Sequence, residues 1–237
     1  MKRKFKEFVK KIIFKFIRPN YIKNTYSQAG EDALVRFLFN EKKIHAPSYL
    51  DLGANAPDDL NNTFLFYQMG STGVCVEADE TLIERIKQLR PKDTILNIGV
   101  GMDGRTEGDF YIFNHSALNT FDKLEAEFRE RQGNFKIVKV VKVKLKDINE
   151  ILSENFVAYP DFLSIDIEGL DLDTLKTLDF NKFPIPVICV ETCNYSENHI
   201  RPKDIRIIEF MNSKDYFVYG DTYINTVFVN TAWFYSQ

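Results

Sequence analysis

The chain has 237 residues, 44% of them hydrophobic and 27% charged, which is typical of a globular protein with one α/β domain or two small ones. The formal net charge is −3, but residues 1–18 carry +7, which leaves −10 for the rest. An acidic body lacks the basic footprint that nucleic-acid binding requires, so nucleic acid is excluded from the expected partners. No apolar run reaches the roughly 18 residues of a membrane-spanning helix, and lysines interrupt any secretory signal at the N-terminus.

The first residues form a separate unit of the sequence. Residues 1–25 are predicted to be a basic amphipathic helix and a linker, and residues 26–237 one domain. Two interpretations of the helix at residues 2–17 remain open: it lies on an anionic membrane surface, or it packs on the domain with its lysines in water. Cys75 and Cys189 lie in apolar runs and are expected to be small buried hydrophobic residues, which indicates a reducing, cytoplasmic compartment. Peripheral contact at the inner face of the membrane would fit the first interpretation.

Apolar, β-branched runs alternate with helical spacing along the chain. Strands are predicted at residues 49–52, 73–77, 94–100, 109–113, 141–146, 162–167, 185–191, 216–219 and 225–230. Helices are predicted at residues 27–42 (capped by Ser27), 61–69, 80–89, 122–131, 146–152, 171–178 and 202–212. This rhythm predicts a parallel sheet with right-handed crossovers and an antiparallel final pair. The lysines at residues 142–146 are interpreted as the solvated face of a strand that buries its other face, and protection of a sheet edge is the alternative.

A short turn with one glycine follows the strand at residues 49–52. Gly53 would let the backbone come close to a ligand, with Asp51 before it and Ala54 and Asn55 after it. The second and third glycines of a dinucleotide fingerprint are missing. A carboxylate at Asp51 suits a ligand with an ammonium and a sulfonium better than a pyrophosphate. The alternative is a tight turn in which Asp51 and Asn55 bond the local backbone.

Acidic residues end the next strands as well. Glu77, with Ala78 beside it, lies 24 residues after Gly53, where an acid can accept both hydroxyls of a ribose. Asp166 and Glu168 would project to one side if their strand continued that far. Because ligands of open α/β sheets bind beyond the carboxyl ends of the strands, these acids predict one cleft.

Three residues are candidates for proton transfer in that cleft. Asp166 is expected to be a general base or an orienter of substrate, with Glu191 and His115 as alternates. His115 lies in a polar loop, residues 114–120, that would cover a cleft, although a surface histidine is the competing interpretation. The carboxylates would suit Mg²⁺ or Ca²⁺ rather than Zn²⁺, but no metal is required. Helix capping is the alternative use of Asp166 and Glu168.

The ordered set of motifs resembles the FkbM-type S-adenosylmethionine-dependent methyltransferases from about Tyr26 to about Asn230. The resemblance includes residues 27–32 (Ser-Gln-Ala-Gly-Glu-Asp), 51–55, 62–63 (Asn-Thr), 77–78, 110–111 (Phe-Tyr), 119–121 (Asn-Thr-Phe), 165–169 (Ile-Asp-Ile-Glu-Gly) and 190–191 (Val-Glu). It implies a class I, Rossmann-like fold with a seven-stranded, mostly parallel sheet, an antiparallel last strand and helices on both faces. Pro57 stands where many members have glycine, and we expect it in the first turn of the next helix.

The same resemblance implies roles for individual residues. Gly53, Ala54 and Asn55 would approach the methionyl part of the donor, S-adenosylmethionine, and Glu77 its ribose. Gln28 and Asp51 would lie near its amino acid end, and Asp166 would face the transferred methyl. Members mostly methylate hydroxyl groups, so a glycan or another small molecule with a hydroxyl is the expected acceptor.

Two further functions stay open from the sequence. One is a nicotinamide-dependent oxidoreductase on a similar sheet, which the missing glycines disfavour. The other is a non-catalytic module that docks on a membrane or on a biosynthetic complex through residues 1–18.

Overall fold

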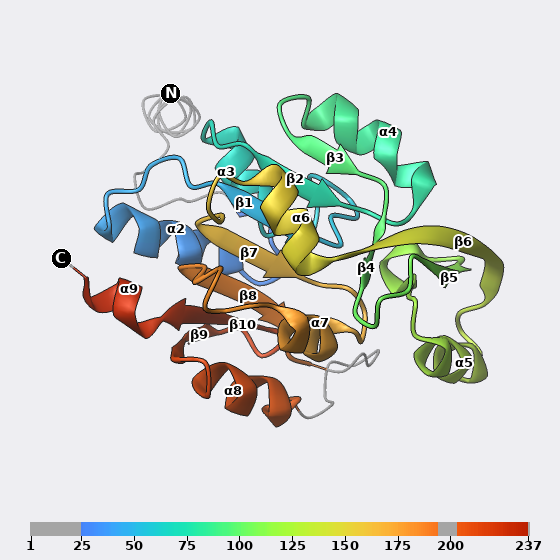
Figure 1. Ribbon diagram of the computed structural model, residues 1–237. Helices are drawn as coiled ribbons and strands as arrows, with labels where there is room; N and C mark the ends of the chain where they lie inside the picture. Colours follow the sequence, from blue (N-terminus) through green and yellow to red (C-terminus); the bar gives the residue numbers. More distant parts are fainter. Residues whose placement is uncertain (1–24, 194–202, 237) are drawn as a thin grey trace, which may run out of the picture.

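A seven-stranded sheet forms the centre of the molecule, shown in the computed structural model of Figure 1, which describes residues 25–193 and 203–236. The expected helix at residues 2–17 lies outside the described residues. The strands of this sheet are β1 (Tyr49–Leu52), β2 (Gly73–Val76), β3 (Thr94–Leu96), β7 (Phe162–Ile165), β8 (Val187–Glu191), β9 (Tyr216–Asp221) and β10 (Asn225–Asn230). Their order is β3-β2-β1-β7-β8-β10-β9, and β10 runs antiparallel to both of its neighbours. The prediction of a mostly parallel sheet with an antiparallel last strand is confirmed.

Helices cover both faces of this sheet, as predicted. On one face lie α6 (Ile148–Asn155), α7 (Asp171–Thr177) and α8 (Ile205–Asn212), and on the other α2 (Glu31–Glu41), α3 (Phe64–Gln68), α4 (Glu80–Leu89) and α9 (Thr231–Tyr235). Neighbouring strand residues point to opposite faces, so Leu163 packs toward α6 and Phe162 toward α2. Cys75 and Cys189 are free thiols with no exposed surface, which confirms that they are buried hydrophobic residues.

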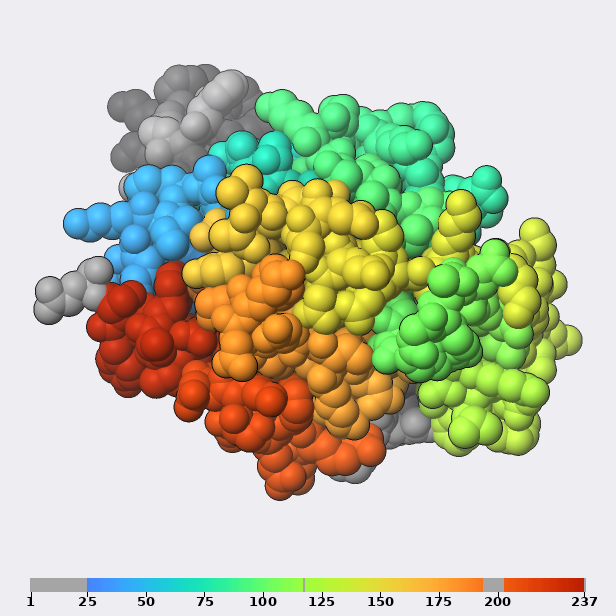
Figure 2. Space-filling view, in the orientation of Figure 1, coloured from blue at the N-terminus to red at the C-terminus, as the bar shows by residue number. Residues whose placement is uncertain are grey.

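A second, three-stranded sheet lies beside the first. It consists of β4 (Gly99–Gly101), β6 (Ile137–Asp147) and β5 (Glu107–Phe113) in that order, with the short helix η1 (Ser116–Leu118) and α5 (Lys123–Arg131) between β5 and β6. We call residues 99–147 the inserted region. Figures 1 and 2 show its green and yellow-green surface at one side of the main sheet.

The prediction of one strand at residues 94–100 is wrong, because the chain divides there between the two sheets. β3 ends where Glu77 donates its backbone N–H to Leu96, and Asn97 then donates its side chain to the carbonyls of Glu77 and Ala78. Gly99 begins β4 against Phe121, where an added Cβ would lie 2.3 Å from the ring. The side-chain bonds of Asn97 and this close approach take the chain out of the main sheet.

The inserted region also differs from its predicted boundaries. β6 is longer than residues 141–146: it pairs with β5 over residues 137–144 and with β4 over its last three residues. The side chains of Lys142 and Lys144 are exposed, which confirms the interpretation of a solvated face. The helix predicted at residues 146–152 begins at Ile148, because the Asp147 carboxylate caps it by accepting from the N–H of Asn149 at 2.7 Å.

Two helices in the first part of the chain, α2 and α3, begin later than the sequence predicted. α2 begins at Glu31 after Gly30, whose φ is 97°, although the Ser27 hydroxyl still accepts from the N–H of Asp32. α3 begins at Phe64, because the Asn61 side-chain oxygen accepts from the N–H of Thr63, which precedes the helix, and from the N–H of Phe64, its first residue. Pro57 therefore lies in the preceding turn, and the expectation that it starts the helix is wrong.

Candidate functional site

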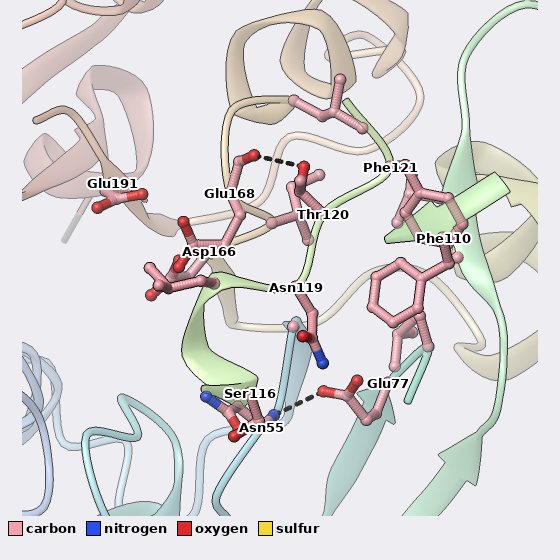
Figure 3. Close-up of a pocket in the computed structure, with 18 of the residues that line it drawn as sticks. Asn55, Glu77, Phe110, Ser116, Asn119, Thr120, Phe121, Asp166, Glu168 and Glu191 are labelled. Carbon is pink, nitrogen blue, oxygen red and sulfur yellow. Dashed lines mark hydrogen bonds between the residues drawn. The ribbon is translucent and has the colours of Figure 1, made fainter. Parts of the chain in front are cut away.

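A cleft of about 320 Å³ opens where β1, β2 and β7 end and where the inserted region meets them. Pockets that take small molecules measure about 300–1,000 Å³, so this cleft has sufficient volume for one. Eight predicted residues line it: Gln28, Gly53, Asn55, Glu77, Ala78, His115, Asp166 and Glu191. Figure 3 shows Asp166, Glu168 and Glu191 on one side of the cleft, and Phe110 and Phe121 on the other side with Glu77 near them.

Glu77 forms a wall of the cleft directly after β2. Its side chain is buried, and its two carboxylate oxygens accept from the N–H of Asn55 at 2.8 Å and the N–H of Asp79 at 2.7 Å. Burial raises the pKa of Glu77 to about 7, although these backbone bonds oppose the shift. The two backbone bonds fix the carboxylate in place and use one lone pair of each oxygen, so it keeps acceptor capacity toward a ligand.

The turn at residues 53–55 is closely packed between two strand ends. The N–H groups of Gly53 and Ala54 both donate to the Val76 carbonyl, and Asp166 donates its N–H to Leu52. Gly53 has a φ of 86°, and an added Cβ would lie 1.9 Å from the Asp166 carbonyl oxygen. Glycine is therefore required twice, by its conformation and by the close approach. The backbone of this turn lies at the cleft floor beside Asp166.

Three carboxylates occupy the acidic end of the cleft, at the ends of β7 and β8. Burial raises the pKa of Asp166 well above its ordinary value, and the charges of Glu168 and Asp171 add to the shift. Burial and the charge of Asp166 do the same to Glu191. Burial raises the pKa of Glu168 to about 7, although Arg129 opposes it. A group with a raised pKa is a better proton acceptor once ionised, which general base catalysis needs.

Asp166 and Glu168 lie on the same side as predicted, but the predicted reason, a strand that continues to Glu168, is wrong. β7 ends at Ile165, and Glu168 has a φ of 55° in a turn, so strand alternation does not apply to it. Both residues nevertheless line the cleft. The alternative of helix capping is not observed, because α7 begins without a side-chain cap bond. The carboxylate of its first residue, Asp171, instead accepts from the N–H groups of Ile167 and Gly169 in the preceding turn, at 3.3 and 3.2 Å.

Apolar side chains make the opposite end of the cleft. Phe110 and Phe121 have ring centroids 4.6 Å apart. Other apolar residues that line the cleft are Val76, Ile98, Val100, Leu118 and Phe135. A flat, uncharged ring system would pack against such side chains. Sequence reasoning found the Phe110 and Phe121 motifs only through the family resemblance.

The loop at residues 114–120 covers the cleft, as its polar sequence suggested. Asn119 donates its side-chain N–H to Asp79 at 3.0 Å, and Thr120 donates its hydroxyl to the Glu168 carbonyl at 2.9 Å. The loop is thus fastened to the ends of both β2 and β7. His115 is exposed on it and lies 6.2 Å from Phe135 between ring centroids, so the cleft includes it only at its rim.

Asp51 and Ala54 are absent from the cleft lining. The Asp51 carboxylate accepts from the Thr63 hydroxyl at 2.7 Å and the Asn61 side chain at 3.0 Å, and it lies 3.5 Å from buried Arg90. Ala54 packs under the turn against Cys75. These contacts give both residues a supporting position beneath the cleft floor. The Asp51 partners are side chains from other parts of the chain, and not the local backbone that the alternative interpretation expected.

Gln28 reaches the cleft from the turn before α2, and buried Glu31 holds this turn in place. Glu31 accepts from the Ala29 N–H at 2.8 Å, from the Thr222 hydroxyl at 2.6 Å and from the Asn225 side chain at 3.0 Å. Burial alone would raise its pKa, but these hydrogen bonds outweigh burial and lower it. The motif at residues 27–32 therefore ties the turn to the loop before β10.

Among residues 25–193 and 203–236, no group of three or more histidine, cysteine, aspartate or glutamate side chains is arranged to hold a metal ion. In the same part of the chain, every helix is too short or too polar to span a membrane.

Comparisons with solved structures find similar arrangements of elements at low sequence identity. The proposed RNA methyltransferase PH1948 of Pyrococcus horikoshii has a TM-score of 0.42 and 12% identity, covering 92% of this chain and 96% of that one. A TehB-like SAM-dependent methyltransferase of Corynebacterium glutamicum has a TM-score of 0.38 and 9% identity, covering 96% and 97%. The methyltransferase domain of bacterial CtHen1 has a TM-score of 0.38 and 14% identity, covering 85% of this chain and 98% of that one. No curated protein matches the chain in sequence.

The strand order and the antiparallel β10 define a Rossmann-like methyltransferase fold. The methyltransferase FkbM domain matches residues 51–218, well over half of the chain. The chain therefore belongs to the FkbM methyltransferase domain family, whose members use S-adenosylmethionine. This assignment replaces the alternative of a nicotinamide-dependent oxidoreductase.

Proposed function

We propose that the protein transfers a methyl group from S-adenosylmethionine to a hydroxyl group of a glycan, such as a bacterial surface polysaccharide. The observation that supports this most directly is that one cleft has Glu77 in one wall and Asp166 with Glu191 at its acidic end. The Glu77 carboxylate suits a ribose, and the pair of Asp166 and Glu191 suits an acceptor hydroxyl. The donor would supply an electrophilic methyl between them.

The residues of the cleft fit the parts of the donor separately. Glu77 is preset by two backbone bonds to accept hydrogen bonds from ribose hydroxyls. Phe110 and Phe121 suit an adenine ring, and the close-packed backbone at Gly53 suits the methionyl part. Gln28 would bind the amino acid end. Because Asp51 and Ala54 lie below the floor, we assign them support of this turn rather than contact.

Asp166 is the residue we propose to orient the acceptor hydroxyl and to take its proton. It is half-buried at the cleft wall, and its raised pKa brings it closer to the range in which a base is effective near neutral pH. Glu191 and His115 remain alternates, although His115 lies at the rim. Alignment of the reacting atoms supplies up to about 7–11 kcal/mol in such reactions, and a base adds about 10²–10⁴-fold.

A polar acceptor is also consistent with the surroundings of Glu191. A second pocket of about 130 Å³ shares Glu191 and Cys193 with the cleft, and charged side chains such as Lys176 and Arg206 line it. Carboxylates and guanidinium groups exchange hydrogen bonds readily with sugar hydroxyls. This arrangement supports a hydroxyl-rich acceptor over an apolar one.

The test combines donor binding with transfer. Calorimetry should detect S-adenosylhomocysteine and should not detect NAD. Incubation of labelled donor with a panel of cell-surface glycans should then add one methyl, seen by mass spectrometry. Asp166→Ala should lower turnover by about 10²–10⁴-fold while donor binding persists, whereas exposed Asp103→Ala should change neither. Full activity of Asp166→Ala would remove Asp166 from the mechanism.

Two other outcomes of these experiments would change the proposal. Retention of the donor without transfer to any hydroxyl acceptor would favour a non-catalytic docking module. Contact of residues 1–18 with a membrane is a separate proposal that rests on their net charge of +7. Deletion of these residues should lower binding to vesicles that contain phosphatidylserine, and unchanged binding would reject the contact.

A further inference from the structure

The guanidinium of Arg129 reaches the acidic end of the cleft from α5 of the inserted region. Its side chain is 2% exposed, and its guanidinium nitrogens donate to groups from three parts of the site. It donates to a Glu168 carboxylate oxygen at 2.7 Å, to the Leu118 carbonyl at 2.9 Å and to Glu125 at 3.0 Å. Two of these partners, Glu168 and Leu118, line the cleft.

Glu168 lies in a backbone turn that its neighbours hold under strain. Its φ is 55° and that of Gly169 is 104°, and a non-glycine residue in this region costs about 1–2 kcal/mol. Asp171 bonds the N–H groups on both sides of Glu168, and the Thr120 hydroxyl bonds its carbonyl. Such strain persists where the surrounding contacts over-determine the conformation, and it concentrates at functional sites. The turn begins directly after Asp166.

A structural role alone accounts poorly for this arrangement. Replacement of a buried ion pair by apolar residues is often neutral or stabilising, because desolvation of the charges offsets their attraction. Arg129 donates at the same time to the Leu118 carbonyl, in the loop that covers the cleft, and to the Glu168 carboxylate, in the cleft wall. The planar fork of arginine can hold both, whereas a lysine ammonium is a point charge.

We infer that Arg129 is a positioning residue: it fastens the cover at residues 116–120 to the turn after Asp166, so that the cleft closes on its ligand in one geometry. This inference rests on the proposed function and deepens it. The ligand that the closed cleft retains is the adenosyl donor. Loss of the fork would leave the fold intact and let the cover open.

The first test compares Arg129→Lys with Glu125→Gln, using S-adenosylhomocysteine as the probe. Arg129→Lys keeps the charge but loses the double contact, so affinity should fall about tenfold, the effect of one lost hydrogen bond to a charged group. Hydrogen exchange at residues 116–121 of the bound protein should become faster. Glu125→Gln removes the third contact of the same guanidinium, outside the cleft lining, and affinity should stay within about twofold of the wild-type value.

A second pair of variants tests the same link from the other side, should Arg129→Lys fail to fold. Thr120→Val removes the hydroxyl that bonds Glu168, and affinity should fall several-fold, whereas Thr120→Ser keeps the bond and should rescue it. Unchanged affinity in Arg129→Lys and in Thr120→Val would overturn the inference while the proposed function stands. If the wild-type protein itself bound no S-adenosylhomocysteine, both the function and the inference would be overturned.

Discussion

The main sheet and the inserted region contribute to the same cleft but are built differently. Every residue of β1 and β7 is buried, so their ends hold Gly53 and Asp166 on a rigid base. In β6, by contrast, Val138 is 67% exposed and Val140 is 47% exposed. The inserted region depends on a small apolar cluster around Phe113 and on polar bonds to the main domain. The comparison indicates that the proposed reacting groups lie on the more buried part of the molecule, whereas the loop that covers the cleft lies on the part that we expect to open at lower cost.

The largest effect is expected for Gly53→Ala in the main sheet, with Gly104→Ala in the inserted region as its matched control. Both glycines have positive φ, 86° and 77°, but an added Cβ meets the Asp166 carbonyl at Gly53 and nothing within 4 Å at Gly104. Gly53→Ala should cost more than about 3 kcal/mol, because strain and a clash add, and should abolish donor binding. Gly104→Ala should cost about 1–2 kcal/mol from conformation alone.

Chemical denaturation and calorimetry of both variants would measure this difference. Equal losses of unfolding free energy would show that the close approach at Gly53 relaxes easily, which would contradict the rigidity of the strand ends.

The next effect is expected for Glu77→Gln, which should weaken S-adenosylhomocysteine binding by about tenfold or more, since bonds from ligand hydroxyls to a charged group are lost. The pH dependence of stability should also change. The folded pKa of about 7 lies above the ordinary value of 4.5. At a pH between these two values, Glu77 keeps its proton in the folded protein but has released it in the unfolded chain. The free energy of unfolding therefore falls as the pH rises through this range.

Thermal unfolding of the wild-type protein and of Glu77→Gln from pH 5 to pH 8 would test the direction of this pH dependence. The wild-type midpoint should fall relative to that of Glu77→Gln up to about pH 7 and run parallel above it. The raised pKa values of Glu168 and Asp171 are common to both proteins and cancel in the difference. A wild-type midpoint that rose over this range relative to the variant would contradict the burial of Glu77.

A smaller effect is expected for Asn119→Ala, which breaks a bond between the two regions. The Asn119 side chain donates to Asp79 and accepts from the Phe113 N–H at 2.8 Å. Its loss should cost about 1–3 kcal/mol of local stability and speed hydrogen exchange at residues 114–121, while exchange in β1 and β7 stays slow. Equal acceleration in both regions would mean that the inserted region and the main sheet open together.

The smallest effect is expected for Lys142→Gln on β6. Lys142 and Asp109 form an ion pair with both side chains well exposed, 66% and 50%. Exposed pairs of this kind contribute little, so the thermal midpoint should stay unchanged within error. A clear decrease would show that this face of the small sheet is covered in solution.

The sequence predicted the main sheet better than the inserted region for a physical reason. Strands buried on both faces require continuous apolar runs, which are visible at β1, β2, β7 and β8. β3 and β4 share one apolar run, and only the bonds of Asn97 and the contact of Gly99 with Phe121 divide it between two sheets. Such long-range contacts leave no periodic signal in the sequence.

The candidate site divides in the same way. Strand-end acids and the glycine turn were predictable, because parallel strands bring their carboxyl ends to one edge of the sheet. Arg129 gave no signal, since an arginine on a charged amphipathic helix is usually solvated. Its burial against Glu168 and Leu118 depends on how α5 packs across the cleft.

By itself, the sequence determined the main alternation of strands and helices, the acids and glycine at the strand ends, and the polar loop that covers the cleft, because these features depend on neighbouring residues. The tertiary structure alone decided that Asp51 lies beneath the floor, that the strand predicted at residues 94–100 divides between two sheets, and that the Arg129 guanidinium joins the covering loop to the turn after Asp166. Those outcomes depend on contacts between residues far apart in the chain, which become defined when the two sheets pack together.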